Sequence, residues 1–332
     1  MKILWRGTPR LSVGGDYEVD EMTVFDGHSD LLYDVMKRRE AGETCVLERH
    51  HLDRLRQGGV EGLVLALWTG GEGVSLSQSR TRRMVACAKA ELAECPAVQI
   101  IHAGTEAEKV REQGKLYAFW GVEGMEALNG DPAGLDQYAD LGARLGMLTW
   151  NEENALATGA KGDPDKGLTE AGKAVIRRME DRNMLVDVSH LNDGGFWDVM
   201  RLTHGPVIAS HSNCRALCNV SRNLTDEQLR MIRDTGGVVG LNVFHGFVHE
   251  ELSKKTVETL AIHAAHMADV MGIEHVACGF DFCEFIDPDD GTLQGLEDAS
   301  KIGNFMEELK KLGMNDQERQ MVARDNFLRV LG

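Results

Sequence analysis

Short apolar runs alternate with longer amphipathic stretches along the chain. Eight runs occupy residues 23–26, 62–68, 116–120, 146–150, 184–188, 206–210, 237–243 and 275–280. Most are almost continuously apolar, which is typical of parallel strands buried on both faces. Helical spacing predicts helices at 79–94, 169–183, 225–234, 256–271, 304–312 and 315–330. The repeated strand–helix unit predicts an α/β fold.

Eight strands with intervening helices predict a closed (β/α)₈ barrel of the TIM type, in a single domain. A chain of 332 residues suits one such barrel with insertions. We expect residues 1–22 to form an N-terminal extension packed on it. A doubly wound open sheet is the structural alternative, but no glycine-rich phosphate-binding motif follows a strand, so a nucleotide-binding version lacks support.

Polar residues follow nearly every apolar run at the point where the predicted strand ends. They are His28, Asp30, Glu123, Asn151, His190, His211, Asn242, His245 and Asp281. In an α/β barrel the carboxyl ends of the strands form the active-site face. Residues far apart in the sequence are therefore expected to meet in one pocket, where His and carboxylate donors would make a metal site.

The donor types indicate how a metal would be held. His28 and Asp30 are two positions apart, so in an extended chain they point the same way and can grip one cation. The two oxygens of Glu123 can bridge two cations. His190 and His211 each follow a predicted strand. An isolated Glu or His at such a place is usually a turn residue or a hydrogen-bonded one. Together, these donors suit zinc before manganese or iron.

Asp281 ends the last predicted strand among apolar residues. A carboxylate there, beside cations, stays ionised and can exchange a proton with substrate. The alternative is a structural Asp that caps a helix or holds a ligand His. We interpret the other histidines as structural or surface residues, namely His50, His51, His102, His204, His263 and His266.

Composition narrows the classes of partner and compartment. A net charge of −17 repels phosphate backbones, so no nucleic-acid partner is expected. Seven scattered cysteines fit reduced thiols in a cytoplasmic protein better than a disulfide framework. Neither a signal peptide nor a membrane-spanning run is recognisable, which favours a cytoplasmic protein with no membrane partner.

Several motifs occur in an order that resembles the membrane (renal) dipeptidase family of zinc peptidases, within the amidohydrolase-like barrels. They are DGHSDLL at 26–32, GVEGMEAL at 121–128, GLTEAGKAVIRRMEDRNMLVDVSH at 167–190, PVIASHSNCRAL at 206–217, SRNLTDEQL at 221–229 and GFDF at 279–282. The similarity runs from about residue 24 to the C-terminus. It implies a zinc-dependent dipeptidase that holds two Zn²⁺ ions, acts on free dipeptides, accepts a D-residue at the C-terminal position, and forms a homodimer.

The resemblance also implies a role for each site residue. His28 and Asp30 correspond to the ligands of the first zinc, and Glu123 to the carboxylate that bridges both metals. His190 and His211 correspond to the ligands of the second zinc. Asp281 corresponds to the acid/base residue. Arg222, which the residues alone do not single out, corresponds to the arginine that binds the substrate carboxylate.

Two positions depart from the family pattern. Trp150, followed by Asn151, stands where the best-known members carry a substrate-holding His, and Phe244 stands near the place of a Tyr. We hypothesise that the Trp150 indole or the Asn151 amide supplies the missing hydrogen-bond donor.

The expected mechanism is attack on the amide carbonyl by a hydroxide that bridges the two metals. Two alternatives stay open. A deaminase or a lactone or cyclic-amide hydrolase would use the same barrel and metals. A non-catalytic binding protein would explain the departures at Trp150 and Phe244, but it would not need Asp281.

Overall fold

The computed structural model describes residues 22–70, 73–286 and 291–332. The strands are β1 (Val24–Ser29), β2 (Val60–Trp68), β3 (Val98–Ile100), β4 (Leu116–Glu123), β5 (Ala143–Met147), β6 (Leu185–Asp187), β7 (Val207–Ile208), β8 (Val239–Leu241) and β9 (Val276–Cys278). Each predicted run overlaps one of these strands. The additional strand is β3, which pairs beside the first residues of β4. The extension predicted at 1–22 lies, except for Met22, outside the described residues.

All the strand pairs are parallel and follow the order β1-β2-β4-β5-β6-β7, with β8 paired to β9. A bridge between Ala209 and Val239 continues the order from β7 to β8. The amide of Asp281 donates to the carbonyl of His28, 3.4 Å away, which brings the end of β9 back to β1. The sheet therefore curls into the predicted α/β barrel.

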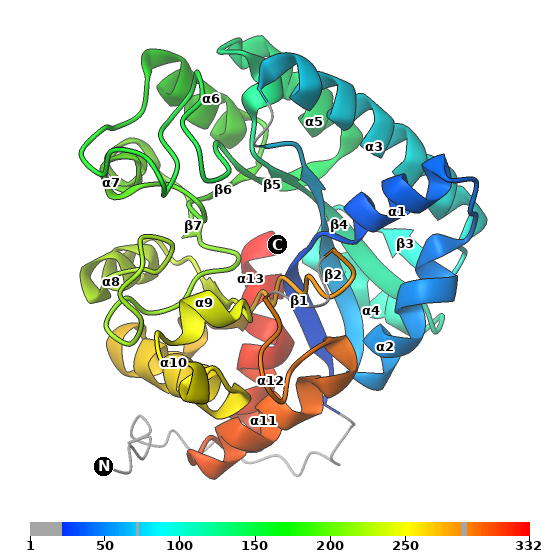
Figure 1. Cartoon of the computed structure of the whole chain (residues 1–332), viewed down its shortest axis with the longest axis vertical. Coiled ribbons are helices and arrows are strands. Elements are labelled where there is room, and N and C mark those ends of the chain that lie inside the picture. The colour runs from blue at the N-terminus through cyan, green and yellow to red at the C-terminus, as the bar shows by residue number, and fades with distance from the viewer. Residues whose placement is uncertain (1–21, 71–72, 287–290) are drawn as a thin grey trace.

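Helices surround the strands (Figure 1). They are α1 (Leu31–Glu40), α2 (Leu52–Gln57), α3 (Val74–Glu94), α4 (Ala107–Arg111), α5 (Asp136–Leu141), α6 (Glu170–Asp181), α7 (Asp193–Leu202), α8 (Asp226–Asp234), α9 (His245–Val248), α10 (Val257–Met271), α11 (Ile302–Lys311), α12 (Asp316–Gln320) and α13 (Asn326–Leu331). The helix predicted at 225–234 is confirmed as α8, and it begins with a capping box in which Thr225 and Gln228 exchange hydrogen bonds. No helix of the described residues is long and apolar enough to cross a bilayer.

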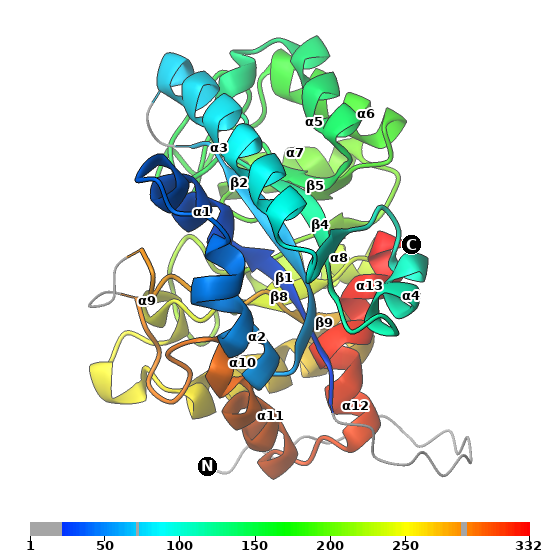
Figure 2. The same cartoon turned by 90° about the vertical axis from the view of Figure 1, so that its right-hand side faces the viewer.

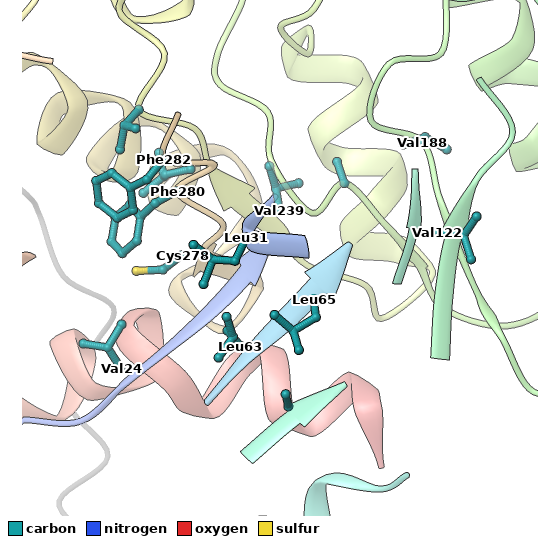
Figure 3. Packing of buried hydrophobic residues seen from close by; sticks show 14 of the residues in the cluster. Val24, Leu31, Leu63, Leu65, Val122, Val188, Val239, Cys278, Phe280 and Phe282 are labelled. Atoms are coloured by element: carbon teal, nitrogen blue, oxygen red, sulfur yellow. The ribbon is translucent and has the colours of Figure 1, made fainter. Parts of the chain in front are cut away.

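Alternate residues of the strands supply two hydrophobic cores. On β2, Leu63 and Leu65 pack outward against the helices, whereas Val64 joins a smaller core inside the barrel. Figure 3 shows part of the outer core, with side chains contributed by β1, β2, β4, β8 and β9. This two-sided burial explains why the strands read as continuous apolar runs.

The C-terminal helix α13 contributes side chains to the inner core. Figure 2 shows it beside β9, and it also contacts β1. The Phe327 ring lies 5.2 Å from the ring of Phe25, centroid to centroid, and a Cβ on Gly27 would collide with it. Because Gly27 directly precedes His28, glycine here lets α13 approach the strand that carries the first candidate ligand.

Candidate metal centre

Glu123 ends β4 and points into the barrel. It has the same parity along the strand as Tyr117 and Phe119, whose side chains belong to the inner core. It is 2 % exposed. Its backbone pairs with Trp68, so the ends of β2 and β4 form the same rim of the barrel. The fold thus places a buried carboxylate at the centre of the active-site face.

Three imidazoles surround this carboxylate. The Nε2 atom of His190 lies 2.8 Å from Oε1 of Glu123, and that of His211 lies 3.9 Å from the same oxygen. On the other side, Nε2 of His28 lies 3.4 Å from Oε2. The two oxygens of Glu123 therefore face different histidines, which is the arrangement a bridging carboxylate requires.

Two further carboxylates adjoin His28. Its Nε2 atom lies 3.8 Å from Oδ1 of Asp30 and 3.9 Å from Oδ1 of Asp281. The amide of Asn242 donates to the other oxygen of Asp281, 3.0 Å away. Asp281 is thereby oriented with one oxygen towards the cluster. The six residues predicted as metal ligands or as the acid/base are thus brought together, whereas His245 stacks on Phe244.

The outer nitrogens of two imidazoles are held by neutral partners. Nδ1 of His190 donates to Oδ1 of Asn151 at 2.9 Å, and Nδ1 of His211 lies 2.8 Å from Oγ of Ser210. The two Nε2 atoms consequently face each other at 2.9 Å. Two ring nitrogens converge in this way when both present lone pairs to a common cation.

Replacing Asn151 with alanine is expected to weaken metal binding about 10- to 100-fold, because the bond to His190 fixes the ring's tautomer and orientation. Titration of the metal-free protein against a competing chelator measures this affinity. If the affinity is unchanged and only kcat/KM falls at saturating metal, Asn151 instead acts on substrate.

The backbone at two of these positions is left-handed. His190 has a φ of 67° and Asp281 a φ of 58°. Such a conformation is uncommon for residues other than glycine and costs about 1 kcal/mol or more. Each lies three positions beyond the last residue of a strand, β6 or β9, so the turn lets each side chain reach the cluster at some expense of stability.

The cluster carries an excess of buried negative charge. Burial, with the neighbouring Asp30, raises the pKa of Glu123 to about 8, and burial raises that of Asp281 to about 6. Burial lowers the pKa of His190 and His211 well below the usual range, so both rings are neutral. Against the effect of burial, Glu123, Asp30 and Asp281 raise the pKa of His28 well above its usual range, so His28 supplies one positive charge. Ionising all three carboxylates at neutral pH requires more positive charge than His28 carries.

Buried polar atoms without a hydrogen-bond partner mark the place where a cation would bind. Both ring nitrogens of His28, Oδ1 of Asp30 and Oε2 of Glu123 are buried without a hydrogen-bond partner in the structure. Burying such atoms is unfavourable unless a cation or a hydrogen-bond donor lies beside them. Nitrogen and oxygen donors in these numbers fit divalent transition metals, zinc included.

Arg222 lies beside the cluster and is 7 % exposed. Its guanidinium makes only long hydrogen bonds, 3.2 Å to the carbonyl of His211 and 3.4 Å to Oγ of Ser212, and stacks over the Phe247 ring. Burial lowers its pKa to about 10. It forms no ion pair with a carboxylate of the described residues, so its charge is available to an anionic group of a ligand.

The two departures from the family pattern lie in different surroundings. The Trp150 ring lies 6.1 Å from that of His190, at the edge of the cluster. Phe244 instead stacks on His245 and packs against Phe247.

Two residues beside the cluster were not predicted from the sequence. They are Ser210, which lies against the ring of His211, and Trp68, which pairs with Glu123. Each lies at or next to the end of a predicted strand, which is the only signal that could have marked it.

A buried cluster of carboxylates and imidazoles at the carboxyl ends of barrel strands defines a metal-dependent hydrolase of the amidohydrolase-like class. Comparison with known proteins identifies the group within that class. The chain belongs to the membrane dipeptidase family (peptidase family M19), whose family model matches residues 19–332. It is therefore an enzyme of the metal-dependent dipeptidase class.

Individual proteins are also similar in sequence to this chain. An uncharacterized protein of Klebsiella pneumoniae, encoded in the pqqA 5′ region, is 34% identical over 233 residues, 68% of this chain and 84% of that protein. An uncharacterized dipeptidase of Schizosaccharomyces pombe is 34% identical over 229 residues, 66% of this chain. The matched part spans 53% of that yeast protein.

A solved structure shares both fold and sequence similarity. It is a metallopeptidase from Rhodobacter sphaeroides, bound to a phosphinate mimic of the dipeptide L-Ala-D-Ala. The sequences are 26% identical, the TM-score is 0.85, and the match covers 94% of this chain and 99% of that one.

Proposed function

We propose that this protein is a zinc-dependent dipeptidase that hydrolyses free dipeptides, including those with a C-terminal D-residue. The observation that carries the proposal is the pairing of the metal-ligand cluster with the buried, unpaired guanidinium of Arg222. The cluster suits amide hydrolysis, and the guanidinium suits a substrate that ends in a carboxylate. The relative from Rhodobacter sphaeroides, which binds a dipeptide mimic, supports the same assignment.

In this proposal His28 and Asp30 hold one zinc ion, and His190 and His211 hold the other. Glu123, whose two oxygens face His190 and His28, would serve both ions. When bound, the metals polarise the scissile carbonyl and make a water-derived nucleophile available at neutral pH. Asn151 and Ser210 keep the imidazoles in the required orientation through their Nδ1 atoms.

Asp281 moves the proton. Its Oδ1 atom faces the cluster, while Asn242 holds Oδ2. In this position the carboxylate accepts a proton from the attacking water and passes it to the amine that leaves. The Asp281 side chain is 16 % exposed, and this partial burial strengthens its interactions with the reacting atoms.

Arg222 selects the free carboxylate of a dipeptide. We expect Arg222→Ala to raise KM about 30-fold or more with a much smaller change in kcat, because a forked, charge-assisted contact is lost from ground state and transition state alike. Arg222→Lys keeps the charge without the fork and should recover little of the loss. Steady-state kinetics on a dipeptide and its C-terminal amide check this. If kcat falls instead of KM rising, the assignment is wrong.

Trp150 offers an indole N–H near the cluster, and we propose it as the donor that holds the substrate carbonyl. The Asn151 amide is the other candidate: its oxygen accepts from His190, which leaves its NH₂ group as the part that can donate to substrate. Trp150→Phe should lower kcat/KM about tenfold, the size of one hydrogen bond. An unchanged kcat/KM would rule out this donor.

The proposed function is tested by measuring metal content and cleavage on one preparation before and after chelation. The panel contains L-Xaa-L-Xaa and L-Xaa-D-Xaa dipeptides. We expect about two zinc ions per chain and cleavage that chelation abolishes and zinc restores. Bound metal without cleavage of any dipeptide would point to a deaminase or to a lactone or cyclic-amide hydrolase.

We also propose a cytoplasmic location and a homodimer. All seven cysteines are free thiols, which supports a reducing compartment. Cell fractionation tests the location, and sedimentation at several protein concentrations tests the dimer.

A further inference from the structure

Beside the cluster, three partly exposed aromatic side chains form a continuous surface. Trp68 lies 5.3 Å from Tyr33 and 5.4 Å from Trp150, measured between ring centroids, and Trp150 in turn lies 6.1 Å from the candidate ligand His190. None of the three is fully buried. We name Tyr33, Trp68 and Trp150 the aromatic wall.

The strand register directs this wall towards the reacting centre. Trp68 ends β2 and has the same parity as Val64, whose side chain belongs to the inner core. It is also the pairing partner of Glu123 on β4. Its side chain therefore lies on the same face of the sheet as that of Glu123, one strand away. The indole nitrogen of Trp68 is buried and makes no hydrogen bond in the structure.

The wall and Arg222 come from different parts of the strand order: Trp68 ends β2 and Trp150 follows β5, whereas Arg222 follows β7, with His190 after β6 and His211 after β7 between them. Arg222 bonds to the backbone of His211. The ring of His211 lies 4.9 Å from that of His190, and the ring of His190 adjoins Trp150. The order across the site is thus Arg222, the two imidazoles, and then the wall.

This order fixes which substrate residue meets the wall. A dipeptide with its carboxylate on Arg222 and its scissile carbonyl at the cluster extends its N-terminal residue towards β2 and β5. Resting on the proposed function, we propose that the aromatic wall is the binding surface for the N-terminal side chain and that it selects large apolar side chains, aromatic ones above all.

The charges around the wall sharpen the class of side chain. The Arg80 guanidinium lies 4.9 Å from the Trp68 ring centroid, and the ammonium of Lys161 lies 5.3 Å from that of Trp150. Lys161 also lies 3.6 Å from a carboxylate oxygen of Glu152, so its charge is partly neutralised, but the two cations already occupy positions over these rings that a substrate cation would otherwise take. Dipeptides that begin with Lys or Arg should therefore be poorer substrates than those that begin with Phe or Leu.

The test compares Phe-Ala, Ala-Phe, Lys-Ala and Ala-Ala in the metal-loaded enzyme. We expect kcat/KM for Phe-Ala to exceed that for Ala-Ala about tenfold or more, because a phenyl ring is buried on the wall. In Trp68→Ala and Trp150→Ala this ratio should fall towards one. The ratio of Ala-Phe to Ala-Ala should not change in the same variants. Trp197→Ala, which removes a partly buried indole from α7, is the matched control and should behave as wild type.

A second measurement uses only the wild-type enzyme and so does not depend on the variants folding. Inhibition constants of phosphinate dipeptide mimics are compared, with glycine, alanine or phenylalanine side chains on the N-terminal half. Binding at least about tenfold tighter with the phenylalanine side chain than with alanine supports the wall. Equal binding, or a Phe-Ala preference that survives in both wall variants, overturns it. If the enzyme cleaves dipeptides without this preference, only the wall is wrong. If it cleaves no dipeptide, the proposed function fails and the wall fails with it.

Discussion

Replacing Glu123 with glutamine is expected to lower kcat/KM about 10³-fold or more at metal concentrations that saturate the wild-type enzyme. Glutamine has the same shape, but it offers one carbonyl oxygen and an NH₂ group where the carboxylate offers two oxygens. The two oxygens of Glu123 face His190 on one side and His28 on the other. The variant therefore loses a ligand to one cation outright, and its metal affinity should fall more than about 100-fold, beyond the effect of losing an orienting partner.

Metal content by elemental analysis, measured beside activity, checks this prediction. Glu91→Gln is the control, because Glu91 of α3 is equally buried but bonds to Arg39 and to the amide of Leu47, away from the cluster. It should bind two metals and retain activity, whatever it loses in thermal stability. Full metal content and near-normal turnover in Glu123→Gln would show that this carboxylate does not bridge the metals.

Most of the fold could be predicted because its strands are buried on both sides. Alternate residues of β2 pack against the helices and inside the barrel, which leaves an unbroken apolar run in the sequence. The short strand β3 was not among the predicted eight, since three residues at the side of β4 leave too short a pattern. The ends of helices with side-chain caps, such as Thr225 at α8, could also be predicted.

The candidate ligands could be found because they follow strands, and the barrel brings strand ends together. The residues that orient them could not. Ser210 and Asn151 act through single hydrogen bonds to ring nitrogens, and such pairs leave no periodic signal. Asn151 was predicted as a hydrogen-bond donor to substrate, which stays a prediction, and its contact with His190 through the side-chain oxygen is an additional role. The aromatic wall was missed for a similar reason, because Tyr33, Trp68 and Trp150 come from three segments far apart in the sequence.

Arg222 could not be predicted as a site residue from the sequence pattern alone. An arginine in a loop ordinarily faces water, and only the resemblance singled it out. The structure adds a physical reason, since its guanidinium is buried without a carboxylate partner among the described residues. A buried cation with long hydrogen bonds is costly to the free protein. The binding of an anionic group offsets that cost. The free protein is therefore less stable, and its affinity for the anionic ligand is higher.

Asp281→Asn is expected to lower kcat about 10²- to 10⁴-fold while KM and metal content change little, because the variant can no longer accept and return a proton. Asparagine keeps the size of the side chain and can still bond to Asn242, so the site should stay in place. The control is Asp34→Asn on α1. The Asp34 carboxylate is also buried, but it bonds to Arg38 and His51, outside the cluster. This control should keep its kcat.

The same experiment separates the two roles that the geometry leaves open for Asp281. Its Oδ1 atom lies 3.9 Å from Nε2 of His28, so it is close enough to share a cation with Asp30. A variant that binds two metals but turns over slowly identifies a proton carrier. A variant that binds one metal identifies a ligand, and the proton transfer would then belong to another group. Metal content therefore has to be measured on the same protein as kcat, since turnover falls in both cases.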